Sequence, residues 1–431
     1  MTISIVGAGY VGLVTGSVFA DFGHKVTVVD IDKKRIEELK GGKTPFFEPG
    51  LEDLIQRGLE SKRLEFTTNY SAAVPVSKVV FICVGTPPLE DGSVDLRQLY
   101  SATESVARHL KGQTIIAVKS TVPIGIEIEL EKIITKTGKN HFEIVAVPEF
   151  LREGTAIEDT LHPDRIVIGA ANSRGKTVDT ILDLHKHFSG ERIITDLRSA
   201  QLIKYAANSL LATKVSFANA VAQLSEKIGA DAQIVLHGVG LDKRIGRTYL
   251  YAGLGYGGSC LPKDVLAFVD VAQKFGYDFG LLTEVDRINQ EQIENFVRRI
   301  RETLGGSVES KKIAILGLSF KPNTDDIREA PSLKIIELLL EQDAKISAFD
   351  PVAIPHVKKV LGNKIDYAKD PYDAAKGADC LAVVTEWNEF LDLDLAKIKK
   401  LMRTPLIADG RNIYDAEKVK DQGFTYFGIG R

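Results

Sequence analysis

Residues 255–264, GYGGSCLPKD, combine a cysteine with groups that could act on a bound ligand. Cys260 follows three glycines within four residues, and Lys263 and Asp264 come about one helical turn later. Glycines let a backbone approach a ligand closely, whereas a cysteine used only for packing usually lies in an apolar run. The pattern suggests a nucleophilic thiol. These ten residues alone do not decide between a nucleophile and an incidental cysteine in a loop.

A second chemical motif opens the chain. Gly7, Gly9 and Gly12 form the pattern GxGxxG after a β-branched apolar run, and the next apolar run ends at Asp30. This strand–turn–helix–strand context predicts a dinucleotide site, with the pyrophosphate on the backbone N–H groups of a helix N-terminus. Asp30 would accept hydrogen bonds from the ribose hydroxyls and repel a 2′-phosphate, which favours NAD over NADP. Arg35 is the nearby residue that could hold such a phosphate.

Residues 1–196 are expected to form a doubly wound α/β sheet of the Rossmann type around this motif. Apolar runs followed by polar breaks predict further strands within residues 79–88, 114–123 and 142–151. Ligands bind beyond the carboxyl ends of strands in such sheets, so the residues just past those ends are candidates. They are Thr86, Thr121 and Glu149. Cys83 lies inside the first of these predicted strands and is expected in the core.

Residues 197–300 are expected to be helical. Residues 197–228 contain no proline or glycine and repeat apolar residues at helical spacing, which predicts one long helix or two in series. Lys204 and Asn208 are four residues apart and share a face of that helix. Their side chains either extend to solvent, the usual outcome, or point into a cleft. The apolar seam also suggests a homodimer.

Residues 301–431 are expected to form a second, degenerate Rossmann-like domain. Residues 311–351 repeat the opening plan but keep only Gly317 of the three glycines, and further strands are predicted at 380–385 and 405–410. Lys321 and Arg328 lie in the first turn, where phosphates would bind. Cys380 begins a predicted strand and is expected in the core.

Composition limits the other partners. The chain has 431 residues with 55 basic and 58 acidic side chains, so its net charge of −3 gives no reason to expect nucleic acid or an anionic membrane. No apolar run approaches the roughly 20 residues that cross a bilayer. Three cysteines without metal-type spacing suggest reduced thiols and a cytoplasmic protein without a metal. His185 and His187 are interpreted as a solvated helix face.

Six sequence blocks in matching order resemble the nucleotide-sugar dehydrogenases of the UDP-glucose/GDP-mannose dehydrogenase family. They are GAGYVG (7–12), KSTVPIG (119–125), PEFLREGTA (148–156), KYAAN (204–208), GGSCLPKD (257–264) and FKPNTDDIRE (320–329). The resemblance runs through the whole chain. Two departures are Leu261, where the family usually has Phe, and Tyr251, where some members carry lysine.

The resemblance implies a four-electron oxidation of a sugar alcohol to a carboxylate with two NAD molecules, and the blocks favour UDP-glucose, giving UDP-glucuronate. One hydride transfer makes an aldehyde. Cys260 would then add to it, and the thiohemiacetal would lose a second hydride to give a thioester. Lys204 and Asn208 would stabilise charge on the sugar oxygen, Asp264 would move protons with a bound water, and Glu149 would assist hydrolysis. Thr121 would position the water or the cofactor.

The resemblance also implies binding residues. Those for NAD are Gly7, Gly9, Tyr10, Val11, Gly12, Asp30, Arg35, Thr86, Thr121, Glu153, Lys263 and Arg328. Those for the nucleotide sugar are Phe150, Leu151, Glu153, Lys204, Asn208, Arg244, Tyr249, Tyr251, Gly253, Gly255, Gly257, Phe320, Lys321 and Arg411. Among them, Arg244 would reach the substrate of the neighbouring subunit.

Three alternatives remain open at this point. Dehydrogenases of UDP-N-acetylmannosamine, UDP-N-acetylglucosamine or GDP-mannose use the same cysteine chemistry. A two-electron dehydrogenase of the hydroxyacid type explains the first domain together with Lys204 and Asn208, but gives Cys260 and the third domain no role. A catalytically inert NAD sensor would require the loss of a chemical residue, and none of the expected ones is missing.

Overall fold

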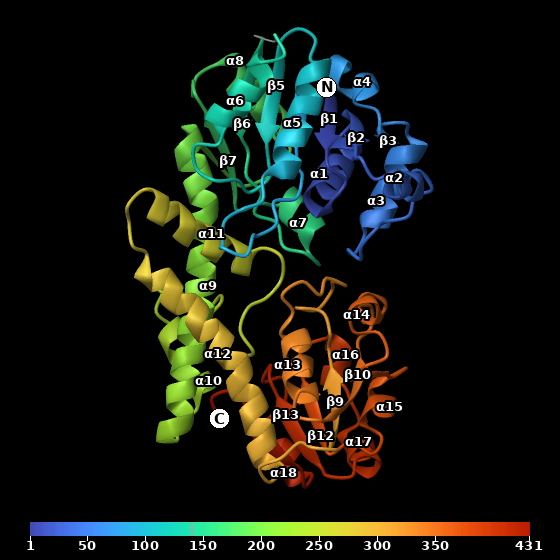
Figure 1. Cartoon of the computed structure of the whole chain (residues 1–431), viewed down its shortest axis with the longest axis vertical. Coiled ribbons are helices and arrows are strands. Elements are labelled where there is room, and N and C mark those ends of the chain that lie inside the picture. Colours follow the sequence, from blue (N-terminus) through green and yellow to red (C-terminus); the bar gives the residue numbers. More distant parts are fainter. Residues whose placement is uncertain (139–140) are drawn as a thin grey trace. The chain divides into compact units, whose positions relative to one another are not determined.

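The computed structural model describes residues 1–138 and 141–431 and divides into two compact units, Met1–Ala207 and Asn208–Arg431. Each unit contains one sheet with helices on both faces (Figure 1). The expected α/β architecture, with two Rossmann-like sheets and long central helices, is confirmed.

The sheet of the first unit has the strand order β3-β2-β1-β4-β5-β6-β7-β8. Its strands are β1 (Thr2–Val6), β2 (Lys25–Val29), β3 (Leu64–Thr67), β4 (Val79–Ile82), β5 (Thr114–Val118), β6 (Phe142–Ala146), β7 (Arg165–Ala170) and β8 (Glu191–Thr195). All neighbours pair in parallel except β6 and β7. The first six strands follow the Rossmann order, and β7 and β8 extend it.

Alternate strand residues of this sheet pack on opposite faces, as the two-residue period of a strand requires. Ile5 and Phe81 join one core cluster with Phe19, whereas Val6 joins another with Leu99. The helices of the unit are α1 (Tyr10–Asp21), α2 (Lys33–Lys40), α3 (Leu51–Glu60), α4 (Tyr70–Ala73), α5 (Arg97–His109), α6 (Glu127–Thr135), α7 (Ala156–Leu161) and α8 (Lys176–Leu184), with a 3₁₀ turn at Val74–Val76. Both faces of the sheet are therefore buried.

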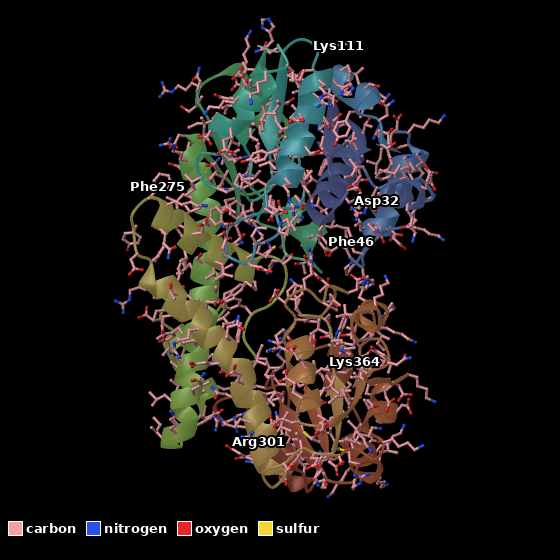
Figure 2. All side chains as sticks on the ribbon, in the orientation of Figure 1. Asp32, Phe46, Lys111, Phe275, Arg301 and Lys364 are labelled. Atoms are coloured by element: carbon pink, nitrogen blue, oxygen red, sulfur yellow. The ribbon has the colours of Figure 1, made fainter. Side chains whose placement is uncertain are left out.

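One long helix, α9 (Leu197–Ile228), runs from the first unit into the second. Its 32 residues confirm a single helix rather than two in series. In the second unit it is followed by α10 (Ala232–Gly240), α11 (Leu261–Lys274) and α12 (Gly280–Thr303). Ala212 of α9, Val265 of α11 and Leu282 of α12 pack in one cluster. Phe275, labelled in Figure 2, lies exposed at the turn after α11.

The sheet of the second unit repeats the Rossmann order as β11-β10-β9-β12-β13-β14, with all pairs parallel. Its strands are β9 (Lys312–Leu316), β10 (Lys345–Phe349), β11 (Asp366–Tyr367), β12 (Cys380–Val383), β13 (Leu406–Asp409) and β14 (Thr425–Gly428). The helices are α13 (Pro331–Leu340), α14 (Ile354–Leu361), α15 (Pro371–Ala375), α16 (Asn388–Leu391), α17 (Leu395–Leu401) and α18 (Ala416–Asp421). The predicted repeat of the opening plan is confirmed.

Two residues differ from the sequence expectation. Cys83 is buried as expected but follows β4 instead of lying inside it, and burial raises the pKa of its thiol to about 12. His185 is not on a solvated face: it is buried after α8, with its ring edge-on to Phe19. His187 is exposed and stacks on Phe22. The packing of aromatic rings around His185 left no signal in the local sequence.

No helix in the described ranges, 1–138 and 141–431, is long and apolar enough to cross a membrane. Within those same ranges, no group of three or more His, Cys, Asp or Glu side chains could hold a metal ion.

Candidate active site

The glycine turn between β1 and α1 has the shape that a dinucleotide requires. Gly7 has φ +104°, and a Cβ there would lie 2.6 Å from the Cys83 carbonyl oxygen. A Cβ on Gly12 would lie 1.9 Å from the Gly7 carbonyl oxygen, so helix and strand pack through glycine. Within the described residues, nothing besides the chain neighbours lies within 4 Å of a Cβ built on Gly9, and no side chain caps α1. The open space faces uncapped N–H groups, which fits a pyrophosphate.

Asp30 follows β2 and is buried beside this turn. Its carboxylate accepts hydrogen bonds from the N–H groups of Ala8 (2.7 Å) and Asp32 (2.9 Å). Arg35 lies 3.3 Å from one Asp30 oxygen, so its guanidinium is held by a carboxylate. A carboxylate at this place can accept ribose hydroxyls and disfavours a 2′-phosphate. The residues present therefore fit NAD.

Glu48 is a buried residue of this region that sequence reasoning missed. Its carboxylate contacts the Tyr10 hydroxyl and accepts hydrogen bonds from the N–H groups of Gly154 (2.5 Å) and Ala156 (2.7 Å). The Tyr10 ring stacks on Phe46 at 4.4 Å between ring centres. Glu48 thus joins the first turn of α1 to the loop after β6. The only signal was an acidic residue in an otherwise apolar run, FFEPG.

Lys204 and Glu149 form a buried ion pair. Lys204 is 4% exposed and its Nζ lies 2.8 Å from Glu149 Oε1, while Oε2 accepts a hydrogen bond from the Leu151 N–H at 2.9 Å. Of the two interpretations left open for Lys204, the one in which its side chain extends to solvent is therefore wrong. The Lys204 ammonium also lies 5.4 Å from the centre of the Phe150 ring. Burial lowers the pKa of the neighbouring Lys119.

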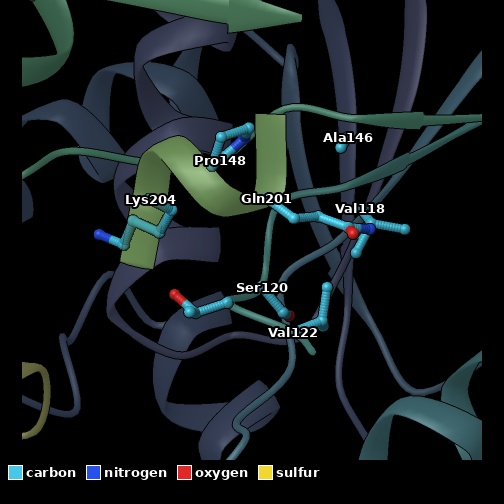
Figure 3. A pocket seen from close by; sticks show the side chains of 8 residues that line it. Val118, Ser120, Val122, Ala146, Pro148, Gln201 and Lys204 are labelled. Atoms are coloured by element: carbon cyan, nitrogen blue, oxygen red, sulfur yellow. The ribbon is translucent and has the colours of Figure 1, made fainter. Parts of the chain in front are cut away.

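A small pocket opens beside Lys204, and Figure 3 shows its lining side chains. It is lined by Val118, Ser120, Thr121, Val122, Ala146, Pro148, Gln201 and Lys204. The predicted position of Thr121 just past β5 is confirmed, and its carbonyl oxygen accepts a hydrogen bond from the Thr86 hydroxyl at 2.9 Å. Glu153 is buried in the loop after β6. The structure thus groups these candidates at the carboxyl ends of the first unit's strands.

Cys260 lies in the second unit at the N-terminal end of α11, where it is the N-cap residue and its side chain is exposed. The Ser259 hydroxyl lies 3.6 Å from its sulfur. The N-terminus of a helix stabilises negative charge, which suits a thiolate. Exposure and this location distinguish Cys260 from the two buried cysteines.

Asp264 lies one turn into α11 and is 1% exposed. Its carboxylate receives hydrogen bonds from Asn208 Nδ2 at 2.6 Å and from Lys263 Nζ at 2.5 Å. Asn208 itself is buried, so the helix face that it shares with Lys204 does not extend to solvent.

The glycine loop before Cys260 packs against the turn after β9. The Gly258 N–H donates to the Arg328 carbonyl oxygen at 3.1 Å. A Cβ on Gly257 would lie 2.1 Å from the Glu329 carbonyl oxygen, and one on Gly258 would lie 2.6 Å from the Phe320 ring. The glycines are therefore needed for the loop to approach this turn.

Arg411 lies at the same edge of the second sheet. Its guanidinium donates to the Val384 carbonyl oxygen (2.7 Å) and approaches the Phe320 carbonyl oxygen (3.4 Å). The Lys321 ammonium lies 5.4 Å from the centre of the Phe320 ring. Arg411 also pairs with Glu386 at 3.1 Å. These candidates form one group around the turn after β9.

Other predicted residues lie at the surface of the second unit. Arg244 is exposed and forms a bidentate pair with Asp242 at 2.6 Å. Arg328 pairs in the same way with Asp326 at 2.5 Å. Tyr251 is 70% exposed, and Tyr249 adopts φ +65°, which is uncommon for a tyrosine. The contacts described for Arg244 are those with Asp242, outside the group of residues around Cys260.

Domains of one family match the chain in sequence. The NAD binding, central and UDP binding domains of the UDP-glucose/GDP-mannose dehydrogenase family match residues 1–189, 198–291 and 314–416, respectively. The chain is 45% identical to a UDP-glucose 6-dehydrogenase of Bacillus subtilis (strain 168), over 100% of this chain and 98% of that relative. It is also 45% identical to a UDP-glucose 6-dehydrogenase of Rhizobium meliloti (strain 1021), over 100% of both chains.

Solved structures agree with the sequence matches. A UDP-glucose dehydrogenase from Pyrobaculum islandicum superposes with a TM-score of 0.93 at 38% identity, covering 100% of this chain and 97% of the other. A UDP-D-ManNAc dehydrogenase from Pyrococcus horikoshii gives 0.88 at 26% identity, with 100% and 99% covered. Sequence and fold thus indicate the same family. The chain belongs to the UDP-glucose/GDP-mannose dehydrogenase family.

Proposed function

We propose that this chain catalyses the NAD-dependent oxidation of UDP-glucose to UDP-glucuronate. The observation that carries the proposal is the exposed thiol of Cys260, placed behind a glycine loop that packs on the UDP-binding domain, in a chain 45% identical over its full length to UDP-glucose 6-dehydrogenases. A two-electron dehydrogenase would not need a thiol at this place.

The overall reaction removes two hydrides from C6 of the sugar and adds one oxygen from water. NAD, when bound, accepts a hydride in each of the two oxidations. We propose that Cys260 Sγ adds to the aldehyde carbon after the first oxidation, so that the adduct retains a C–H bond that the second oxidation breaks. Water then attacks the thioester, which releases the carboxylate and returns the thiol.

Polar residues of both units are proposed to support these steps. Lys204 and Asn208 would stabilise negative charge on the sugar oxygen, because a preorganised cation and amide need no reorientation during the reaction. Asp264 would exchange protons through a bound water, and Glu149 would assist hydrolysis of the thioester. The ion pair at 2.8 Å and the amide–carboxylate bond at 2.6 Å support these roles because they hold the donors in place. Thr121 would orient the water or the cofactor.

The binding roles follow the two nucleotide-type domains. Residues 1–196 are proposed to bind NAD through the groups predicted for it in that domain, with Glu153 at the nicotinamide, and Lys263 and Arg328 would add contacts from the rest of the chain. Residues 197–300 would contribute the loop that surrounds the sugar, and residues 301–431 would hold uridine and phosphate through Phe320, Lys321 and Arg411. Stoichiometry tests the whole proposal: each UDP-glucose should yield two NADH and one acid without free aldehyde. Preference for UDP-N-acetylmannosamine, UDP-N-acetylglucosamine or GDP-mannose in the same assay would reassign the sugar.

We also propose a homodimer formed along α9. Leu210, Phe217, Leu224 and Ile228 are between 52% and 68% exposed, and their spacing of seven, seven and four residues places them on one helix face. The exposed Arg244 would then reach the substrate of the neighbouring subunit. Sedimentation of the Phe217→Asp variant should show a shift towards monomer. A cytoplasmic location remains a prediction.

A further inference from the structure

The loop at residues 249–258 connects α10 to α11 without regular secondary structure. Tyr249, Gly255 and Gly258 adopt positive φ angles of +65°, +88° and +82°. Backbone groups in such a loop lack the hydrogen-bond partners that a helix or strand would supply. Those that are buried therefore need other partners. Gly253 and Tyr256 are both buried, so the question is what pairs with their N–H and C=O groups.

Three amide side chains supply these partners. The Gly253 N–H donates to Asn219 Oδ1 on α9 at 2.9 Å, and the Gly253 carbonyl oxygen accepts from Gln292 Nε2 on α12 at 2.8 Å. The Tyr256 N–H donates to Asn289 Oδ1 on α12 at 2.8 Å, and its carbonyl oxygen accepts from Asn289 Nδ2 at 3.0 Å. One amide thus pairs with both backbone groups of Tyr256, as a neighbouring strand would.

These three amides are buried, so each of their donors and acceptors needs a hydrogen-bond partner within the protein. Asn219, Asn289 and Gln292 are 0%, 5% and 2% exposed. Gln223 Nε2 donates to Gln292 Oε1 at 2.9 Å, which fixes the orientation of that amide. Asn219 Nδ2, in contrast, has no hydrogen-bond partner within the described residues. A buried unpaired donor is unfavourable, and the hydrogen bond that Asn219 Oδ1 accepts from the Gly253 N–H offsets this cost.

Glycine at position 255 completes the contact. A Cβ on Gly255 would lie 2.4 Å from Asn289 Oδ1, closer than real atoms approach. The loop can therefore take this position against α12 only with glycine there. Cys260 follows Tyr256 by four residues, so a displacement of Tyr256 would also displace the thiol.

We propose that Asn219, Asn289 and Gln292 form an amide clamp, a set of positioning residues that hold loop 249–258 in the shape that receives the sugar and places Cys260. This inference rests on the proposed function, because it takes the loop as the sugar site. None of the three side chains is assigned a contact with substrate. Their effect passes through the loop backbone, and a small displacement near a reacting group can lower the rate strongly.

The test compares Asn289→Leu with a matched control, Ser216→Ala. Leucine has the same branched arrangement of side-chain heavy atoms as asparagine but removes both bonds to Tyr256. Ser216 is also buried on α9, and its hydroxyl donates to the Val285 carbonyl oxygen at 2.7 Å and not to the backbone of the loop. We expect Asn289→Leu to raise KM for UDP-glucose about tenfold and to lower kcat, with KM for NAD within about twofold. Ser216→Ala should lower Tm without moving either KM.

Amide hydrogen exchange of peptides covering residues 249–258 provides a readout independent of activity. Exchange there should rise in Asn289→Leu and stay unchanged in Ser216→Ala. If Asn289→Leu does not fold, Asn289→Ala removes the same two bonds without adding apolar bulk, so it should show a change of the same kind. Unchanged constants for UDP-glucose with faster loop exchange would overturn the proposal, as would unchanged exchange. A wild-type chain that forms no NADH from UDP-glucose would instead contradict the proposed function.

Discussion

The two Rossmann-like sheets share a strand order but use the same acidic position in opposite ways. In the first unit, Asp30 follows β2 and accepts two backbone N–H groups while the glycine turn beside it stays open. In the second unit, Asp350 follows β10, and its carboxylate accepts hydrogen bonds from the backbone and side chains of the same unit. Its donors are the N–H groups of Leu318, Ser319, Val352 and Ala353, the Ser319 hydroxyl and the Trp387 indole.

The turns that precede the first helices differ in the same sense. In the first unit, α1 begins at Tyr10, three residues after Gly7. In the second, α13 begins at Pro331, and residues 318–330 lie between it and Gly317. Ser319 stands where Gly9 stands in the first turn, and it is buried against Asp350. The open turn is suited to a pyrophosphate on backbone N–H groups, whereas the long turn presents Lys321 and Arg328. We therefore propose that one topology supports two ways of holding a nucleotide.

The largest expected effect separates chemistry from cofactor binding. Cys260→Ala removes the nucleophile from the second unit and leaves the glycine turn of the first unit intact. Acid formation from UDP-glucose should fall by about a thousandfold or more, because the second oxidation loses its adduct. The variant should still bind NAD and should reduce supplied UDP-sugar aldehyde with NADH. Acid formation near the normal rate by the folded variant would remove Cys260 from the mechanism.

A smaller effect is expected at Lys204, the buried cation of the first unit. Lys204→Met keeps most of the side-chain volume and should lower kcat about a hundredfold, since one preorganised donor to the sugar oxygen is lost. It also removes the ammonium that pairs with the buried Glu149 carboxylate, so Tm should fall. Glu149→Gln is the control that removes the carboxylate and keeps Lys204. Near-normal turnover in folded Lys204→Met would show that the ion pair is structural only.

The two acidic positions can be compared directly. Asp30→Ala should raise KM for NAD about tenfold and change kcat little, because ribose binding is weakened without loss of a transition-state contact. Asp350→Asn should leave KM for NAD unchanged and lower the stability of the second unit by about 2 kcal/mol, since an amide cannot accept all of the donors that surround Asp350. Equal use of NADP by the wild type would show that Arg35, rather than Asp30, governs cofactor choice.

Sequence reasoning located the two sheets and the long helix because each depends on local patterns. The GxGxxG turn, the apolar runs before Thr86, Thr121 and Glu149, and the uninterrupted 197–228 segment all carry their signal within a few residues. The short strands β11 and β14, and β3, β7 and β8, were not predicted. Two residues in β11, for example, pair only because β10 lies beside them.

The partners of the site residues could not be read from the sequence. Glu48 contacts Gly154 and Ala156 across more than a hundred positions, and Asn289 and Gln292 reach a loop over thirty positions earlier. Such contacts are set by the packing of whole elements, for which no local pattern exists. The same reason explains the wrong interpretation of His185, whose buried environment is formed by Phe19 and Phe188.

The smallest effect concerns how the two units respond to acid. Burial lowers the pKa of His185 in the first unit to about 3, against an ordinary value of 6.5. Between these values the unfolded state binds the proton and the folded state does not, so the stability of the first unit falls as the pH drops from about 6.5 towards 3. In the second unit, burial raises the pKa of Asp409. There the folded state binds the proton first, so this group adds stability as the pH falls towards 3.8.

Trp387, the single tryptophan, lies in the second unit and reports on it alone. During acid titration, far-UV circular dichroism should therefore begin to fall before tryptophan fluorescence shifts. His185→Gln cannot acquire the imidazolium charge, because its amide does not titrate, so it should bring the two transitions closer together. Coincident transitions in the wild type, or the same separation in His185→Gln, would show that His185 does not set the acid sensitivity of the first unit. The sheets would then differ in nucleotide binding but not in their response to protons.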